Sequence, residues 1–238
     1  MKLKRAVRGV VGDVGNIVFP AYCHSCNHVA DEGQWAPLLC RDCADSFPFW
    51  DSVVSVPGPL AGGHALSRFE GPAKDLLVAL KYKGLLQAGG AFGARMATAS
   101  EAGAWLQRSE LIVPLPLHWR RRWARGHNQA MTLVRGMVRN GHWGKACPAL
   151  SRVRATRAQV GLGRGSRLAN VRGAFAVKQR AASRVQGARV LLVDDVVTTG
   201  ATAAAAATAL KMAGAREIRL YAAAWAQPTG SRAGFRMV

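Results

Sequence analysis

The segment that most constrains this chain runs from Val190 to Thr202 and reads VLLVDDVVTTGAT. Four apolar residues, Val190 to Val193, are typical of a buried parallel strand. Two aspartates and a threonine-rich segment follow, and the alanine- and leucine-rich run from Ala203 to Ala213 predicts a helix that Gly214 ends. The segment therefore predicts a strand, a polar loop and a helix in direct succession.

The polar loop of this segment suits a ligand that carries both a phosphate and a diol. A helix N-terminus attracts anions through its free N–H groups and its dipole, and Gly200 lets the backbone approach them closely. Asp194 and Asp195 would repel a phosphate unless they face sugar hydroxyls or Mg²⁺, which proteins often bind partly through substrate oxygens. Hydroxyl donors to the phosphate come from Thr198, Thr199 and Thr202. The alternative is a plain strand–turn–helix with a solvated pair of aspartates.

The length of 238 residues allows one domain and a small appendage, and 50% of the residues are hydrophobic. We expect no membrane span, because no uninterrupted apolar run is long enough to cross a bilayer. Residues 1–20 begin like a signal peptide, but Asp13 and Asn16 interrupt the apolar part and no clean small-residue cleavage site follows. We expect a short amphipathic helix there and a cytoplasmic protein.

The formal net charge is +20, and it is unevenly distributed. Residues 61–238 contain 28 basic and seven acidic residues, and no Asp or Glu lies between Leu111 and Val193. A field of this sign attracts pyrophosphate esters, nucleic acid or anionic lipid. A general preference for surface arginine is the alternative, since 25 of the 33 basic residues are Arg.

Four cysteines near the N-terminus form two CxxC pairs, Cys23 with Cys26 and Cys40 with Cys43. Two such pairs match a structural Zn²⁺ site with four thiolate ligands. Disulfides and a redox CxxC are the alternatives, but nothing indicates secretion, and the segment before Cys23 does not resemble the strand that precedes a redox motif. We expect Cys147 to be a buried or incidental thiol.

The remaining elements follow from periodicity and turn residues. Prolines and glycines over residues 51–66 predict a linker between an N-terminal module, 1–50, and a main domain, 67–238. Helices are expected at 73–83, 90–107 and 129–139, and strands at 111–116, 175–177 and 217–225.

Several ordered motifs carry a resemblance to a known family. The segment Val190–Thr202 resembles the phosphoribosyl-pyrophosphate (PRPP) signature of type I phosphoribosyltransferases. The chain as a whole resembles the ComF family of bacterial competence proteins, which belongs to the phosphoribosyltransferase superfamily. Besides the PRPP signature, the matching segments are the cysteines at 23–43 and residues 80–84, 113–116, 125–129, 154–159 and 167–175. His127 stands where an aromatic residue such as Phe is expected.

The resemblance implies an α/β fold, a type I phosphoribosyltransferase with a mostly parallel, Rossmann-like sheet and a small N-terminal zinc ribbon. It implies that Asp194 and Asp195 are the candidate catalytic residues, holding the ribose hydroxyls and Mg²⁺. The implied PRPP-binding residues are Asp194, Asp195, Val196, Val197, Thr198, Thr199, Gly200, Ala201 and Thr202, with Lys81, Arg120 and Arg125 neutralising the pyrophosphate. A role in natural transformation is also implied, with single-stranded DNA handled on the cytoplasmic side, beside a helicase-like partner.

Two functions remain open from the sequence. The first is a PRPP-dependent glycosyltransferase, whose acceptor no set of residues identifies. The second is a single-stranded nucleic-acid-binding protein that uses the basic surface and the zinc ribbon without turnover. The second function assigns base stacking to Trp119, Trp123 and Trp143, and core packing is the alternative for each of them.

Overall fold

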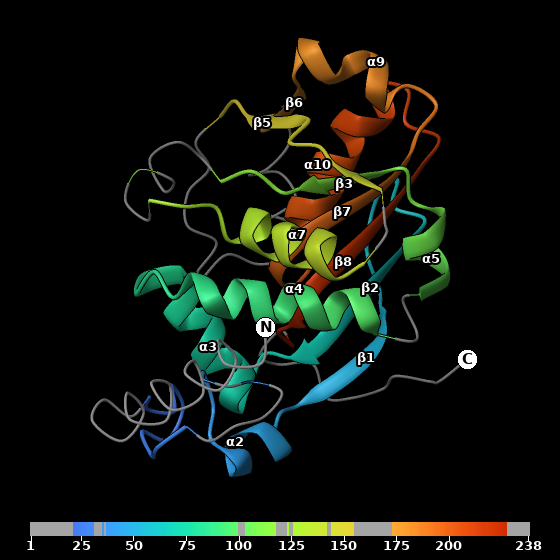
Figure 1. The fold of residues 1–238 in the computed structure, drawn as a ribbon. Helices are drawn as coiled ribbons and strands as arrows, with labels where there is room; N and C mark the ends of the chain where they lie inside the picture. Colours follow the sequence, from blue (N-terminus) through green and yellow to red (C-terminus); the bar gives the residue numbers. More distant parts are fainter. Residues whose placement is uncertain are drawn as a thin grey trace, which may run out of the picture.

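A computed structural model of the chain describes residues 21–30, 35, 37–99, 103–117, 123, 126–141, 144–154 and 173–227. The helix expected within residues 1–20 lies outside these ranges. A six-stranded sheet in the order β1-β2-β8-β7-β3-β4 forms the centre (Figure 1), and within this sheet, as described, β1 alone is antiparallel to its neighbour. The strands are β1 (Phe49–Val54), β2 (Gly62–Arg68), β3 (Leu111–Pro114), β4 (Lys145–Ala146), β7 (Arg189–Val197) and β8 (Glu217–Trp225).

Helices cover both faces of this sheet (Figure 1). One face carries α3 (Gly71–Tyr82), α4 (Leu86–Thr98), α5 (Gly103–Arg108) and α7 (Gln129–Asn140). The other carries η1 (Gln179–Ala181), α9 (Ala182–Val185), α10 (Ala201–Met212) and a two-stranded sheet of β5 (Leu150–Arg152) and β6 (Phe175–Val177). This three-layer arrangement places the carboxyl ends of the parallel strands at one edge, where open α/β sheets bind ligands.

The central strand β7 shows why the sheet lies between two cores. Leu191 and Val193 are buried against the α3–α4–α7 layer, and Val190 and Leu192 against the α10 layer. Burying one such side chain stabilises the fold by about 1.5–3 kcal/mol. The predicted buried parallel strand is confirmed, and so is the mostly parallel sheet.

Close packing of α4 on α7 depends on glycine. A Cβ added to Gly93 would lie 2.2 Å from the Leu133 carbonyl oxygen, and one on Gly136 would lie 2.5 Å from the Gly90 carbonyl oxygen. No side chain fits at these positions, so the two helix backbones approach directly. This contact fixes α7 against the sheet next to β3.

The structure differs from the sequence-based prediction most strongly over residues 51–66. The expected linker instead contains most of β1 and the start of β2, and only the segment between them is a turn. Of the prolines and glycines that suggested a linker, Pro57, Gly58 and Pro59 lie in that turn, and Gly62 and Gly63 begin β2.

Smaller differences concern the ends of elements. The single helix expected over 90–107 is two helices, α4 and α5, and the strand expected over 111–116 ends at Pro114. Strand β6 pairs with β5 and not with the main sheet. Strand β7 extends to Val197 and so includes both aspartates, because its backbone pairing with β8 continues beyond the apolar run.

The cysteine-containing segment packs against the helical layer through aromatic residues. The Trp35 ring stacks on Phe47 with 4.4 Å between centroids and meets the edge of Phe92 of α4 at 5.1 Å. The Ser25 hydroxyl donates to Asp75 Oδ2 of α3 at 2.6 Å. The segment, which includes α2 (Arg41–Asp45), is therefore continuous with the main core. Within the described ranges, no helix has the length and apolar character needed to cross a bilayer.

Candidate functional site

The two aspartates lie at the carboxyl end of β7, where the strand leaves the sheet. Their carboxylates turn back onto the chain: Asp194 Oδ1 accepts the N–H of Asp195 at 2.9 Å, and Asp195 Oδ1 accepts the N–H of Val196 at 2.7 Å. These local bonds hold the two carboxylates in place and leave their second oxygens for other partners.

Lys81, near the end of α3, provides the nearest described cationic partner. Its Nζ lies 3.3 Å from Asp195 Oδ2, with 16% and 14% of the two side chains exposed. The same ammonium lies 5.5 Å from the centre of the Phe69 ring, which adds a cation–π contact. The structure thus brings together Lys81 and Asp195, which the sequence assigned to one site.

Asp194 is held in an environment that opposes its ionisation. Burial raises the pKa of its carboxyl well above the usual range, and the negative charge of Asp195 raises it further. The Lys81 ammonium and a backbone hydrogen bond from Asp195 act in the opposite direction but do not offset this. A divalent cation placed between the two carboxylates would relieve the repulsion, so the pair suits a metal-bridged ligand.

The loop after β7 ends at the N-terminus of α10. Gly200 caps this helix with a φ of +71° and accepts the Ala204 N–H at 2.8 Å. A Cβ on Gly200 would lie 2.8 Å from Pro57 Cδ, so both the backbone conformation and the packing require glycine. The N-terminus of α10, with the positive end of its dipole, therefore directly follows the loop.

The threonines of the loop differ in their surroundings. The Thr199 hydroxyl is buried and has no hydrogen-bond partner among the residues described, whereas Thr198 is exposed. A buried hydroxyl without a partner is costly and indicates a missing ligand or water. Together with the dipole at the N-terminus of α10, this fits an anion bound in the loop.

His127 and Asn128, in the connection before α7, bond to the ends of α3, β3 and α7, and the sequence-based prediction did not include these contacts. His127 Nε2 lies 2.7 Å from the Leu80 carbonyl oxygen, one residue before Lys81. Asn128 caps α7 through the Ala130 N–H at 3.1 Å and donates to the Leu115 carbonyl oxygen at 3.2 Å. The signal was present as an Asn directly before a periodic apolar segment, which is a helix-cap pattern.

The other predicted PRPP-binding residues fall into two groups. Val196 and Val197 end β7, and Ala201 and Thr202 begin α10, so all four border the loop. Arg120 and Arg125 lie outside the described residues, and their place relative to the acids stays a prediction.

The two CxxC pairs come together in space. The Sγ atoms of Cys23, Cys26, Cys40 and Cys43 all lie within 4.8 Å of one another, and those of Cys26 and Cys40 are 3.5 Å apart. Four thiolates around one zinc ion at 2.3 Å lie about 3.8 Å apart, so the cluster can hold a single metal ion. Cys147 is buried elsewhere, against the α10 layer, as expected.

Two thiols of this cluster have pKa values that are shifted in opposite directions. Burial and the three neighbouring thiols raise the pKa of Cys43. Burial also acts to raise the pKa of Cys23, but backbone N–H groups of Cys26, Cys40 and Ser25 lower it to about 6. Without a cation, Cys23 therefore favours the thiolate and Cys43 the thiol, and a bound cation would favour the thiolate form of both.

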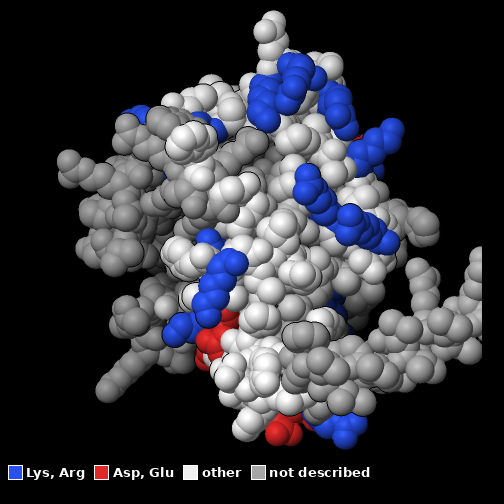
Figure 2. Space-filling model, turned by 60° about the vertical axis from the view of Figure 1, so that its left-hand side comes forward, with Lys and Arg blue, Asp and Glu red and all other residues white. Residues whose placement is uncertain are grey.

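The surface carries the charge imbalance seen in the sequence. Figure 2 shows one face on which Lys and Arg side chains are spread widely and Asp and Glu occupy a few small patches. Trp123 is 88% exposed, so its indole is not part of the core. Trp119 and Trp143 lie outside the part of the chain that the structure describes.

Comparisons with known proteins agree with this geometry. Residues 153–233 match the family model described as a phosphoribosyl transferase domain. The chain is 32% identical to the DNA utilization protein YhgH of Salmonella typhimurium, over 77% of this chain and 76% of that protein. It is 28% identical to competence protein F of Haemophilus influenzae, over 82% of both chains.

A solved glutamine PRPP amidotransferase from B. subtilis matches 58% of this chain and 26% of its own, at 19% identity and a TM-score of 0.40, too low to carry an argument. The similarity to the YhgH protein extends over most of both chains, and the phosphoribosyl transferase match contains β7, the loop and α10. The chain therefore belongs to the ComF family of competence protein F and YhgH, with a type I phosphoribosyltransferase fold and an N-terminal four-cysteine cluster.

Proposed function

We propose that this protein binds PRPP together with Mg²⁺ at the carboxyl end of β7. The observation that carries the proposal is the adjacency of two features: the Asp194–Asp195 pair, and the N-terminus of α10 directly behind Gly200. The first suits a diol and a divalent cation, and the second suits a phosphate. PRPP presents all of these groups on one sugar.

Each part of the site has a role in this proposal. The N–H groups of residues 198–202 and the Thr199 hydroxyl hold the 5′-phosphate. Asp194 and Asp195 hold the ribose hydroxyls and would also hold Mg²⁺, which would neutralise charge on the ligand. Lys81, with Arg120 and Arg125, neutralises the pyrophosphate. On binding, the Lys81 ammonium would exchange its ion pair with Asp195 for one with the ligand. Its Nζ lies 3.3 Å from Asp195 Oδ2, so a small movement of the Lys81 side chain is enough.

Glycosyl transfer is the reaction that such a site would support. In it the bond from ribose C1 to pyrophosphate breaks, pyrophosphate leaves with the electron pair, and an acceptor forms the new bond at C1. The protein contributes position and charge neutralisation, so no nucleophilic side chain is required. The loop, the acids and Lys81 provide both contributions.

A structural zinc ion in the four-cysteine cluster and a role in DNA uptake complete the proposal. Relatives of this chain are named for competence and for DNA utilization. By their resemblance we place the protein in the cytoplasm, where its thiols stay reduced. There it would act on incoming single-stranded DNA beside a helicase-like partner.

A calorimetric series of related ligands tests the PRPP site. The expected order of affinity is PRPP with Mg²⁺, then PRPP with a chelator, then ribose 5-phosphate, because each step removes a cation or a charged group that the site neutralises. Equal affinity for PRPP with and without Mg²⁺ would remove the metal from the proposal. Absence of binding by all three would remove the proposal itself.

Single-stranded nucleic-acid binding without turnover is a second candidate function. The almost fully exposed Trp123 and the excess of Lys and Arg favour it, since nucleic acid binds through stacking and phosphate neutralisation. Affinity for an oligodeoxythymidine should then fall steeply between about 50 and 200 mM salt. An affinity that stays flat over this interval would contradict this function.

A further inference from the structure

A cavity lies at the edge of the sheet opposite the Asp194–Asp195 pair, at the amino ends of β7 and β8. Its volume is about 90 Å³, and it is lined by Trp105, Arg108, Ser109, Arg189, Val190, Glu217 and Arg219. Arg189 and Asp194 are five residues apart on β7, so this cavity is roughly 16 Å from the acid pair. One small ligand cannot occupy both places.

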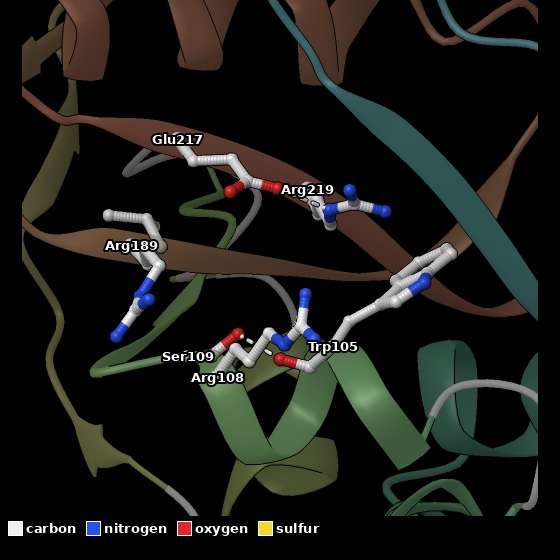
Figure 3. Close-up of a pocket in the computed structure, with 7 residues that line it drawn as sticks. Trp105, Arg108, Ser109, Arg189, Glu217 and Arg219 are labelled. Carbon is white, nitrogen blue, oxygen red and sulfur yellow. Dashed lines mark hydrogen bonds and ion pairs between the residues drawn. The ribbon is translucent and has the colours of Figure 1, made fainter.

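Three arginines and one glutamate line this cavity, and Figure 3 shows the Arg108 guanidinium within the space while that of Arg189 turns away from it. Arg219 Nε lies 2.5 Å from Glu217 Oε1, so this pair is internally neutralised. The Arg219 guanidinium also lies 4.9 Å from the centre of the Trp105 ring, which fixes it against the wall. The Arg219–Glu217 ion pair therefore forms one wall of the cavity and adds no net charge to it.

The other two arginines have donors that the described residues do not use. Arg189 Nε is buried and makes no hydrogen bond among the residues described; it forms only a long ion pair, 3.8 Å from Glu110 Oε2, an oxygen that also accepts the Arg189 backbone N–H at 2.8 Å. Figure 3 shows the Arg108 side chain reaching from α5 into the space between α5 and the strands. Within the described ranges Arg108 has no ion pair. Planar guanidinium groups in this state suit an oxyanion such as a phosphate.

The cavity size limits what can enter. A volume of about 90 Å³ is far below the roughly 300–1,000 Å³ of pockets that enclose whole small molecules. A single phosphate group fits, and a whole nucleotide does not. The site therefore suits a phosphate that belongs to something extending along the surface.

Basic residues continue along this same edge. Backbone hydrogen bonds join its turns: Glu110 N–H to the Arg189 carbonyl at 2.9 Å, Lys145 N–H to the Glu110 carbonyl at 3.2 Å, and Arg216 N–H to the Ala188 carbonyl at 2.9 Å. Lys145 and Arg216, both exposed, therefore lie on either side of the cavity. Five basic side chains, those of Arg108, Lys145, Arg189, Arg216 and Arg219, thus outnumber the carboxylates of Glu110 and Glu217 here, and this excess of positive charge beside a phosphate-sized cavity suits a nucleic-acid strand.

We propose that this edge of the sheet, with the Arg108–Arg189 cavity at its centre, binds the phosphate backbone of single-stranded nucleic acid. The inference rests on the second candidate function above and gives it an interface separate from the PRPP loop. Strand binding at one edge of the sheet and PRPP binding at the other are then independent.

The test is fluorescence anisotropy with a labelled 20-nucleotide oligodeoxythymidine. The variant is R108Q/R189Q, and the matched control is K74Q/K83Q, which removes two exposed positive charges, one on α3 and one directly after it. We expect R108Q/R189Q to weaken binding at least about tenfold at 0.1 M salt and to reduce the slope of log affinity against log salt by about 1.4, or ~0.7 per lost contact. The control should change affinity less than about twofold.

The possible outcomes separate the inference from the functions it accompanies. If wild type binds the strand and R108Q/R189Q binds as tightly as the control, this interface is wrong while nucleic-acid binding stands. If wild type does not bind the strand, both fail. Loss of binding to phosphatidylserine vesicles, with unchanged oligonucleotide binding, would make this edge a lipid surface and overturn the inference.

Two further measurements exclude indirect effects. Arg108 is exposed, so R108Q alone tests the cavity without risk to folding, and a several-fold loss of affinity is expected from it. PRPP binding by R108Q/R189Q should equal that of wild type. If PRPP affinity falls in parallel with strand affinity, the variant disturbs the whole fold and the assignment of the interface is contradicted.

Discussion

Lys81 Nζ lies 3.3 Å from Asp195 Oδ2, and this pair joins the end of α3 to the end of β7. The His127 ring contacts the carbonyl oxygen of Leu80, the residue before Lys81, at 2.7 Å. The connection that precedes α7 thus fixes the position of the Lys81 backbone. The cation of the proposed site is therefore positioned before any ligand binds.

Lys81→Gln should weaken PRPP binding about tenfold or more, because it removes a charge-assisted contact worth about 1.5–3 kcal/mol. Lys83→Gln is the matched control, since Lys83 lies at the same helix end but is exposed. Calorimetric titration of both variants with PRPP and Mg²⁺ measures the difference. Equal loss in the two variants would mean that general charge, and not the position of Lys81, matters.

Asp194→Asn should stabilise the ligand-free protein at neutral pH. Burial and the charge of Asp195 raise the folded-state pKa of Asp194. Below the unfolded-state pKa of about 3.9 the carboxyl is protonated in both states, so it does not lower the free energy of unfolding there. As pH rises above that value, the unfolded chain ionises more readily, and the wild type loses stability until the folded pKa is passed. The Asn variant avoids this loss, by about 1–3 kcal/mol at pH 7.

Urea unfolding of wild type and Asp194→Asn at pH 4 and pH 7 measures this effect. The free energy of unfolding should differ little at pH 4, and the advantage of Asn should appear at pH 7. A variant that is less stable than wild type at pH 7 would show that the Asp194 carboxylate is stabilised and not strained.

Gly200→Ala should destabilise the fold by more than Gly84→Ala. Both glycines have a φ near +70°, which costs about 1–2 kcal/mol for alanine. A Cβ on Gly200 also meets Pro57 at 2.8 Å, whereas nothing lies within 4 Å of one on Gly84. Thermal unfolding should therefore rank the two variants, and equal melting temperatures would contradict the packing of residue 57 behind the loop.

Cys40→Ser should abolish binding of one zinc ion per chain, because it removes a buried ligand of the four-cysteine cluster. It should also lower the melting temperature, since Cys40 and Trp35 belong to the same core as Phe92 of α4. Cys147→Ser, a buried cysteine outside the cluster, is the control for the metal content. Metal analysis that finds zinc retained in Cys40→Ser would exclude the four-cysteine site.

The sequence predicted the strand–loop–helix unit well because its signals are local. Apolar residues 190–193, the glycine at 200 and the alanine run each specify their own conformation. The predicted helix start at Ala203 was two residues late, since Gly200 caps the helix directly. The cysteine pairs were equally clear, as thiol spacing alone indicated the cluster.

What the sequence could not give depends on contacts between distant segments. The turn at residues 55–61 was read as part of a linker because its prolines and glycines are locally typical of one. Its flanking segments are strands because β2 pairs with β8, which lies about 155 residues later. The roles of His127 and Asn128, and the arginine cavity at the opposite edge, likewise arise only when separate elements meet.

The central claim, PRPP binding at the carboxyl end of β7, is tested most directly by calorimetric titration of PRPP with Mg²⁺ into wild type and D194N/D195N. The matched control is E110Q/E217Q, which removes two carboxylates at the other edge of the sheet. The account predicts binding by wild type and by the control, and loss of at least about a hundredfold in D194N/D195N. Unchanged affinity in D194N/D195N, or no binding by wild type, would contradict it.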